Sequence, residues 1–444
     1  MCPSTGESIP HEVPKRDDDE APKEPFPWHI GVYDAHCHPT DTMASISSIN
    51  NMQARLLTIM ATRGQDQDLV ASVAEQHGIT DLNELRESSS SETPKKVVPA
   101  FGWHPWFSHQ LYDDSKDEEE EEGEEVTDVQ AHNRKTKHYS TVLSPPPDAD
   151  FIASLPDPIP LSKYLQETRQ RLLAHPTALV GEIGLDKAFR LPWGKVNESS
   201  SSSRNDGDLT PGGREGRMLS PYHVKMAHQV DVLKAQLRLA GELGRPVSLH
   251  GVQAHGVLFD ALASLWKGHE KEVVSRKKQK MIAKGVSEDF SSSSSDEESD
   301  YSEFGLVGEP KQQQQQQLHT AKKSKKKPYK PKSKPFPPRA CLHSFSGPPQ
   351  VLKQYLDPKI PVKCYFSFSM VVNLGTAGGE AKFADVIRAC PDGQVLVESD
   401  LHVAGEDMDG YLEDIARRIC EIKGWGLEGG MQRIRRNYEE FLFG

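Results

Sequence analysis

The chain has little cysteine, and its few cysteines form no recognisable framework. Six cysteines are scattered over 444 residues, and no two of them form a CxxC pair. A set of structural disulfides is therefore not expected. The scatter is typical of reduced thiols in an intracellular protein.

The sequence also lacks a hydrophobic segment that could cross a membrane. No apolar run reaches about 18 residues, the length that a spanning helix needs. Residues 1–20 contain neither the apolar stretch of a signal peptide nor the Arg-rich amphipathic pattern of a transit peptide. We expect a soluble intracellular protein, in the cytoplasm, the nucleus or both, with no membrane partner.

A broad basic surface is missing as well. The 53 lysines and arginines face 65 acidic residues, which gives a net charge of −12. Residues 113–125 account for −9 and the eight lysines of residues 322–334 for +8, so the rest of the chain carries −11. Proteins that grip duplex DNA by its phosphates carry a basic stripe. If this protein handles a phosphodiester, a group other than lysine must supply positive charge.

Four tracts have compositions that cannot build a core. They are an N-terminal tail, residues 1–25, and three low-complexity inserts, at about 109–147, 195–217 and 268–338. The lysine run in the last insert is typical of a nuclear-import or polyanion-binding patch, and equally of a solvated disordered tract. We expect one domain over residues 26–444 that these inserts interrupt, because α/β barrels reach about 250 residues undivided.

Eight apolar segments alternate with helical patterns along the remaining sequence. Strands are expected at 29–36, 55–62, 96–104, 178–185, 246–252, 340–346, 364–370 and 394–400. Helices are expected at 68–78, 161–175, 223–244, 256–268, 348–356, 382–390, 410–424 and 430–443. The longest has an apolar stripe at three- and four-residue steps, formed by Val224, Ala227, Val230, Leu233, Leu237 and Ala240. The alternation predicts an α/β fold, a (β/α)8 TIM barrel with long disordered inserts.

Residues that can bind metal stand at the ends of five of these strands. Reactive side chains in such barrels gather at the carboxyl ends of the strands. His36 and His38 end the first strand and face the same side, because residues two apart in a strand do so. The other four strand ends supply Glu182, His250, His343 and Asp400.

Four histidines and two acids fit two divalent ions about 3.5–4 Å apart, with one carboxylate between the ions. Taken alone, the two histidines of the first strand are also compatible with an ordinary polar loop. His250 or His343 alone is compatible with a buried core histidine. Glu182 is the hardest to explain structurally, because an unpaired carboxylate within an apolar run is costly. The combination favours a metal site.

The same residues lie in six motifs that occur in a characteristic order. The motifs are DAHCH at 34–38, GWHP at 102–105, GEIGLD at 181–186, PVSLH at 246–250, CLHSFSG at 341–347 and VESD at 397–400. In this order the chain resembles the TatD-like metal-dependent deoxyribonucleases, from about Trp28 to the C-terminus without the inserts. The insert-rich layout is most similar to a fungal branch described as partners of an anaphase-promoting-complex subunit.

The resemblance implies a metal-dependent hydrolase barrel with two divalent ions. His36, His38 and Asp400 would hold one ion, His250 and His343 the other, and Glu182 would bridge them. Asp400 would accept a proton from the attacking water as general base. The resemblance favours Mg²⁺ or Mn²⁺, while the histidines suit Zn²⁺ equally well. It also implies a DNA or other phosphodiester substrate and a protein partner in the anaphase-promoting complex.

The strand-five motif departs from the family pattern. The family usually has an arginine two residues after the histidine, whereas here Gly251, Val252 and Gln253 follow His250. An arginine that could grip a phosphate is therefore missing. Lys187 and Arg190 are candidates to replace it, or are ordinary solvated charges.

The GWHPW segment allows two interpretations. His104 could contact the substrate at the barrel mouth while Trp106 stacks on a nucleobase. Alternatively, Trp103 and Trp106 pack under the loop that follows.

Three functions remain in competition. The first is a phosphodiesterase that trims 3′ ends of DNA with a two-metal-activated water. The second is a hydrolase of a different small substrate, such as an amide, lactone or ester, because the fold alone does not select the leaving group. The third is a regulatory scaffold that binds partners through its charged inserts.

Overall fold

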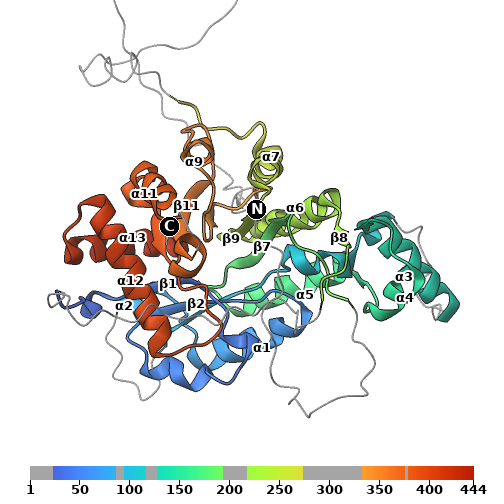
Figure 1. Ribbon diagram of the computed structural model, residues 1–444, viewed down its shortest axis with the longest axis horizontal. Helices are drawn as coiled ribbons and strands as arrows, with labels where there is room; N and C mark the ends of the chain where they lie inside the picture. The colour runs from blue at the N-terminus through green and yellow to red at the C-terminus, as the bar shows by residue number, and fades with distance from the viewer. Residues whose placement is uncertain (1–23, 87–94, 117–127, 194–217, 274–332, 376–378) are drawn as a thin grey trace, which may run out of the picture. The chain divides into compact units, whose positions relative to one another are not determined.

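The structure is a computed structural model that describes residues 24–86, 95–116, 128–193, 218–273, 333–375 and 379–444 (Figure 1). Residues 1–270 and 334–444 belong to one compact unit. Residues 271–333 form a second unit, of which only 271–273 and 333 are described. Among the described helices, none combines the length and the apolar character of a membrane span.

Eight parallel strands form the centre of the first unit. They are β1 (Tyr33–Cys37), β2 (Leu56–Met60), β3 (Val97–Ala100), β7 (Val180–Asp186), β9 (Val247–Val252), β10 (Arg339–Leu342), β11 (Lys363–Phe368) and β12 (Val395–Val397). Hydrogen bonds join them into two sheets, in the orders β1-β2-β3 and β12-β11-β10-β9-β7, and every neighbouring pair is parallel. Each strand is rich in buried apolar residues, as expected where helices and the barrel interior cover both faces.

Backbone contacts close the two sheets into a barrel. A parallel bridge between Ala100 and Leu179 joins β3 to the start of β7. On the other side, the Asp400 amide donates to His36 O at 3.0 Å, and the His38 amide donates to Leu401 O at 2.8 Å. The (β/α)8 barrel expected from the sequence is therefore confirmed.

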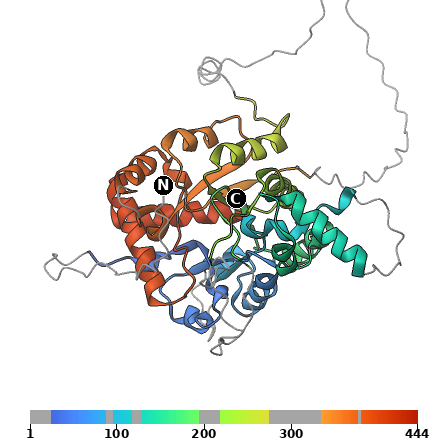
Figure 2. The same ribbon diagram turned by 45° about the vertical axis from the view of Figure 1, so that its right-hand side comes forward.

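Helices surround the strands (Figure 2). The eight expected from the sequence are α1 (Gly64–His77), α5 (Leu161–Ala174), α6 (Met226–Leu243), α7 (His255–Trp266), α9 (Pro349–Tyr355), α11 (Gly379–Ala389), α12 (Glu406–Lys423) and α13 (Leu427–Phe443). The other described helices are α2 (Leu82–Arg86), α3 (Asp128–Val142), α4 (Ala149–Ser154) and α10 (Met370–Leu374), with 3-10 turns η1 (Trp28–Ile30), η2 (Pro39–Asp41), η3 (Ile46–Asn51), η4 (Pro105–Gln110), η5 (Asp114–Lys116) and η7 (Asp392–Gln394). Short strands are β4 (Leu111–Tyr112), β5 (Leu143–Ser144), β6 (Ile159–Pro160) and β8 (His223–Val224).

Helix α6 packs differently from the stripe that its sequence predicts. Leu233, Leu237 and Ala240 are buried as expected, but Ala227 is exposed and Val224 lies on β8 instead. The face is rotated because polar side chains share it. These are Gln229, which binds both backbone groups of Asp186 at 2.8 and 2.9 Å, and Gln236, which binds both backbone groups of Trp103 at 2.8 and 3.1 Å.

The expectation that residues 109–147 build no core is wrong for their second half. Helix α3 and strand β5 lie there, and Tyr139 and Leu143 are fully buried. Phe151 and Ile152, a few residues further on, are among their apolar partners, and the others are far away in the sequence, namely Phe189, Leu191, Tyr222 and Val224. We call α3, β5, α4, β8 and residues 189–191 the α3 lobe, in which α3 and α4 lie together (Figure 1). Local composition could not reveal this core because two separate connections build it.

Most of the expected N-terminal tail and of the other two inserts lies outside the described residues. This holds for residues 1–23, 194–217 and 274–332. Where the third insert is described, its end departs from the expectation. Phe336 is 2 % exposed and packs in the core against Gly241, where a Cβ atom would lie 2.5 Å from the Phe336 backbone.

Candidate metal centre

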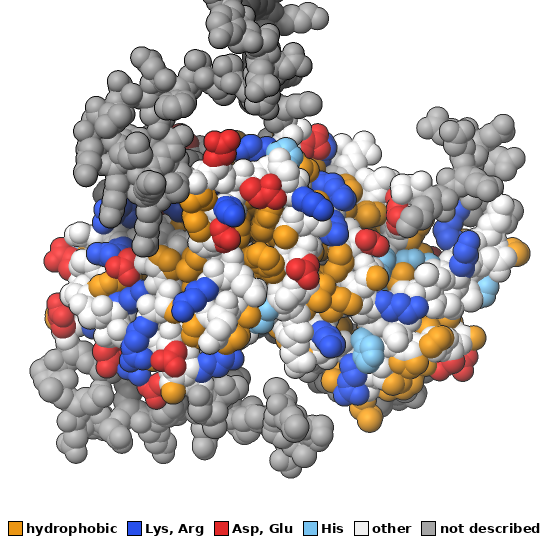
Figure 3. Space-filling view, turned by 90° about the horizontal axis from the view of Figure 1, so that it is seen from above, with side chains coloured by type: hydrophobic (Ala, Val, Ile, Leu, Met, Phe, Trp, Pro, Cys, Tyr) orange, Lys and Arg blue, Asp and Glu red, His pale blue; other side chains and the backbone are white. Residues whose placement is uncertain are grey.

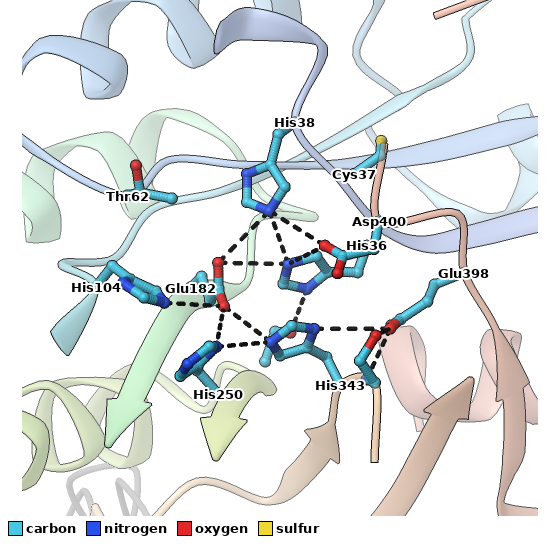
Figure 4. A network of polar contacts seen from close by, with 12 residues as sticks. His36, Cys37, His38, Thr62, His104, Glu182, His250, His343, Glu398 and Asp400 are labelled. Atoms are coloured by element: carbon cyan, nitrogen blue, oxygen red, sulfur yellow. Dashed lines mark hydrogen bonds and ion pairs between the residues drawn. The ribbon is translucent and has the colours of Figure 1, made fainter. Parts of the chain in front are cut away.

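The structure brings the six residues expected to bind metal into one cluster at the mouth of the barrel (Figure 4). Because all the strands are parallel, their carboxyl ends meet at this mouth. Glu182 on β7 occupies the centre of the cluster. The other five are His36 on β1, His38 directly after it, His250 on β9, His343 directly after β10 and Asp400 three residues after β12.

One oxygen of Glu182, Oε2, faces the first group of side chains. It lies 3.4 Å from Nε2 of His36 and 3.5 Å from Nε2 of His38, and these two nitrogens are 3.1 Å apart. Asp400 Oδ1 completes the group at 3.9 Å from His36 Nε2 and 3.6 Å from His38 Nε2. Cys37 points the other way, toward Thr58 O. The alternation along β1 therefore sends both imidazoles to one point.

The other oxygen of Glu182, Oε1, faces the second group. It lies 2.8 Å from Nδ1 of His250 and 2.8 Å from Nε2 of His343, and these two nitrogens are 3.1 Å apart. Nε2 of His104 approaches the same oxygen at 3.2 Å. The two oxygens of one carboxylate thus each face a separate set of ring nitrogens.

His104 is buried within this cluster, with 2 % of its surface exposed. The backbone N–H of Trp106 donates to its Nδ1 at 3.2 Å. The proton of the neutral ring therefore sits on Nε2, which can donate to Glu182 Oε1. Burial lowers the pKa of His104 to about 4, so the ring is neutral at pH 7. In this tautomer His104 acts as a donor and offers no lone pair to a metal.

The carboxylates of the cluster favour positive charge on His38, His250 and His343, whereas burial lowers the pKa of His36. Burial by itself would raise the pKa of Glu182, but the surrounding histidines hold it well below its usual range. Burial would lower the pKa of His343, yet the charges of Glu182 and Glu398 hold it well above its usual range. The pKa of His38 rises to about 9 because its polar contact with Asp400 and the charge of Glu182 outweigh burial.

These residues fit divalent cations. Pairs of imidazole nitrogens face each other at 3.1 Å beside a carboxylate, an arrangement in which lone pairs converge. A cation between them would supply the positive charge that the raised histidine pKa values indicate. Among the described residues, three groups of histidine and carboxylate side chains bring ligand atoms within 4.8 Å of one another, and all three lie in this cluster. Imidazole and carboxylate together suit Zn²⁺ and Mn²⁺.

Comparison with known proteins gives the family. Residues 33–443 match the family model described as TatD related DNase. The chain belongs to the TatD-related DNase family. It is 34 % identical over 412 residues to the Cut9-interacting protein scn1 of Schizosaccharomyces pombe, covering 93 % of this chain and 98 % of that protein. It is 29 % identical over 233 residues to the uncharacterized deoxyribonuclease YMR262W of Saccharomyces cerevisiae, covering 52 % of this chain and 60 % of that protein.

Solved structures with a similar course of the chain include YJJV, a TatD homologue of Escherichia coli. It has a TM-score of 0.44 and 15 % identity, and the match covers 93 % of this chain and 98 % of that one. An uncharacterized amidohydrolase of Saccharomyces cerevisiae has a TM-score of 0.45 and 12 % identity, with 94 % and 100 % covered.

Asp34 anchors two ligand-bearing segments of this TatD-related chain to each other. Its carboxylate is fully buried and accepts hydrogen bonds from the His36 amide at 3.0 Å, the Ser399 amide at 3.0 Å and Ser399 Oγ at 2.5 Å. Burial raises the pKa of Asp34 to about 7 in spite of these bonds. Asp400, the residue after Ser399, has a φ of 56°, a conformation that non-glycine residues adopt only when their surroundings hold them there.

Buried side chains outside the six expected ligands hold the histidine rings in place. Ser248 Oγ lies 3.0 Å from His36 Nδ1, and Glu398 Oε1 lies 3.6 Å from His343 Nδ1. Glu398 in turn accepts the Ser344 amide at 2.7 Å. Such contacts fix the ring orientation and leave the other nitrogen for a metal. A sequence signal for Ser248 existed, because it lies two residues before a ligand on the same strand face.

His402 is a further residue of the mouth that sequence reasoning missed. Its ring stacks on His38 with the centroids 5.4 Å apart, and its Nδ1 lies 2.9 Å from Asp41 Oδ2. Its place two residues after Asp400 was the available signal.

The tryptophans of the GWHPW segment are held within the protein. Trp103 is 3 % exposed and donates its indole N–H to Phe107 O at 2.8 Å. Trp106 is partly buried, and its indole N–H donates to Asp186 Oδ2 at 2.6 Å. Packing under the following loop therefore describes Trp103. Lys187 and Arg190, the two candidate replacements for the missing arginine, are both exposed.

Proposed function

We propose that this protein is a metal-dependent phosphodiesterase that trims 3′ ends of DNA. The observation that supports it is the position of Glu182, whose two oxygens each face a separate set of imidazole nitrogens at 2.8–3.5 Å. A carboxylate between two ligand groups suits a pair of ions 3.5–4 Å apart. Membership of the TatD-related DNase family supports the substrate class.

In this proposal each ligand group holds one divalent ion. His36, His38 and Asp400 would hold the first ion, His250 and His343 would hold the second, and Glu182 would contribute a carboxylate oxygen to each group. When bound, two such ions lower the pKa of water and neutralise charge on a phosphoryl group. Mg²⁺ or Mn²⁺ is favoured by the family resemblance, and Zn²⁺ suits the imidazoles equally well.

The chain itself supplies the proton acceptor and the donor. Asp400 remains ionised near neutral pH, because its polar contact with His38 and the charges of nearby histidines outweigh burial and lower its pKa to about 2. It can take the proton of an attacking water as general base. His104, neutral and protonated on Nε2, lies 3.2 Å from Glu182 Oε1, and it would donate to an oxygen of the substrate by exchanging this contact. We assign it to substrate binding.

The cations also account for a nuclease without a basic stripe. On the face in Figure 3, the coloured Lys and Arg side chains are scattered among acidic and apolar ones. Cations bound in the mouth would supply positive charge to a phosphate there. This favours a strand end that enters the site over a duplex held along the surface.

Release of nucleotides from a labelled single-stranded oligonucleotide tests this proposal. With Mg²⁺ or Mn²⁺ the purified full chain should release nucleotides, and Glu182→Ala and His36→Ala should abolish the release. His132→Ala, on the exposed surface of α3, is the matched histidine control and should retain it. Activity that survives Glu182→Ala would exclude the proposed centre.

A hydrolase of another small substrate is the second candidate. The observation in its favour is Val252, which occupies the position two residues after His250 where the family usually has an arginine. A panel of phosphodiesters, amides, lactones and esters separates the two candidates. Turnover of an amide or lactone by a protein that leaves every phosphodiester intact would establish the alternative.

We also propose a protein partner in the anaphase-promoting complex. The support is the relative named a Cut9-interacting protein, 34 % identical over 93 % of this chain. The charged inserts at 109–147, 195–217 and 268–338 would mediate it as a regulatory scaffold. Binding of the purified Cut9 counterpart to the full chain, compared with a chain lacking residues 274–332, tests this, and equal binding would exclude the third insert.

An intracellular location, cytoplasmic or nuclear, goes with these proposals. The five cysteines in the described part of the chain are buried, and none forms a disulfide. Fractionation of cells that express the tagged full chain checks this location.

A further inference from the structure

The second ligand group depends on a contact that lies outside it. His250 directs Nδ1 to Glu182 Oε1, and its other ring nitrogen, Nε2, lies 3.3 Å from Asp186 Oδ2. A carboxylate on the far nitrogen of a ligating histidine fixes the ring orientation and raises the basicity of the ligand. Asp186 is therefore in the position that controls the ring of His250.

Asp186 is itself held rigidly. It is 5 % exposed, and its Oδ1 accepts the amides of Ala188 at 2.7 Å and Phe189 at 2.9 Å. Its backbone is bound on both sides by Gln229 of α6. The remaining oxygen, Oδ2, is shared between His250 and the indole N–H of Trp106, which donates at 2.6 Å. Among the described residues, Trp106 and His250 are thus the two that contact this oxygen.

Trp106 contacts two of the three histidines that face Glu182 Oε1, namely His104 and His250. Its main-chain N–H sets the tautomer of His104, and its indole N–H holds the carboxylate behind His250. The ring edge meets His104 at a centroid distance of 4.7 Å and His250 at 6.1 Å. Trp106 therefore supports His104 directly and His250 through Asp186, while His343 lies against Glu398 instead.

The α3 lobe packs against the indole ring of Trp106. The indole stacks on Phe189, with the centroids 4.7 Å apart and an angle of 12° between the planes. Phe189 belongs to the buried core of the lobe with Tyr139 and Tyr222. Antiparallel pairing of β5 with β8, Leu143 opposite Val224, joins the two connections that build this core. The stacked pair of Phe189 and Trp106 thus connects the core of the α3 lobe to the side chains around His250.

We propose that Trp106 and Asp186 form a positioning pair through which the α3 lobe holds His250 in its ligating orientation. Neither side chain belongs to the ligand groups, and the pair acts on the group of Glu182 Oε1, His250 and His343 through the ring of His250. The inference rests on the proposed two-ion centre. Beyond that proposal, the two ions would depend on different parts of the fold. Asp34 binds the backbone of the segments that carry the first group, whereas the α3 lobe positions His250 of the second group.

Calorimetric titration of the full chain with Mn²⁺ tests this inference. The second ion is identified as the binding step that His343→Ala abolishes. Trp106→Phe keeps the ring stack and the main-chain bond and removes the indole N–H, so that step should weaken about 10-fold or more while the other step stays unchanged. Asp186→Asn, which removes the carboxylate itself, should weaken the same step and serves where Trp106→Phe does not fold.

Trp103→Phe is the matched control. It removes an indole hydrogen bond of similar length, 2.8 Å to Phe107 O, three residues away in the chain. Both binding steps should match the wild type in this variant. Unchanged second-ion affinity in Trp106→Phe and Asp186→Asn overturns the inference, as does equal weakening of both steps. A wild-type chain that binds no second ion overturns the two-ion proposal itself, which distinguishes the two failures.

Discussion

Replacing Glu182 by glutamine tests the centre of the site most directly. The change preserves the shape of the side chain and removes its charge. In the structure this carboxylate is 3 % exposed and lies 2.8–3.5 Å from the ring nitrogens that converge on it, those of His36, His38, His104, His250 and His343. An ion bound among those nitrogens would lie within about 4 Å of the carboxylate.

The expected loss follows from Coulomb's law. Two unit charges about 4 Å apart interact by about 4 kcal/mol at an effective dielectric constant of about 20. Since 1.4 kcal/mol corresponds to a factor of ten, Glu182→Gln should weaken both divalent ions by roughly 1,000-fold or more. The affinities of both binding steps should fall together, because each Glu182 oxygen faces one of the two ligand groups.

Calorimetric titration with Mn²⁺ measures both affinities. Glu439→Gln is the matched control, since Glu439 is a buried glutamate on α13 beside Tyr33 and Arg435 and should leave both steps intact. If Glu182→Gln binds two ions with affinities close to the wild type, the carboxylate does not bridge them and the electrostatic reasoning is wrong.

Three further predictions concern stability. Burial lowers the pKa of His109 to about 3 and of His138 to about 4, so each folded-state pKa lies below the ordinary value near 6.5. The two neutral rings contribute fully to the free energy of unfolding above pH 6.5, and this contribution is lost as the pH falls toward 4. The urea midpoint should therefore drop over that range, and it should drop less in His138→Gln. Equal drops in the two proteins would contradict the assignment. Tyr438→Phe, which removes the buried 2.5 Å contact with Thr58 Oγ1, should cost about 1–2 kcal/mol in urea unfolding and leave the Mn²⁺ isotherm unchanged. Each bound ion should stabilise the fold by about 2.7 kcal/mol at a free concentration 100 times its Kd, so EDTA should lower the melting temperature, and an indifferent melting temperature would speak against ion binding.

The positions of the ligands were accessible from the sequence because they follow from local rules. Alternating apolar runs and amphipathic segments gave all eight strands and eight of the helices, with bounds displaced by a few residues. Parallel strands bring their carboxyl ends to one rim, so His36, Glu182 and Asp400 could be placed together despite their separation in the chain. The β1 alternation likewise sends Cys37 away from the site.

The α3 lobe and the rotated face of α6 were not accessible. Tyr139 and Leu143 look like isolated apolar residues in a polar tract until they meet Tyr222 and Val224. Gln229 and Gln236 look like solvent-exposed positions until they bind backbone groups on β7 and just after β3. Composition describes each segment alone, whereas burial depends on what another segment brings.

The sequence by itself thus determined the barrel, its parallel strands and the residue types at its mouth. Only the tertiary structure decided which nitrogen of each histidine faces Glu182, which tautomer His104 adopts, and that Trp106 is tied to Asp186. The physical reason is the difference in range. Strand and helix periodicity is set within a few residues, while ring orientation is set by hydrogen bonds from chain segments that meet only after folding.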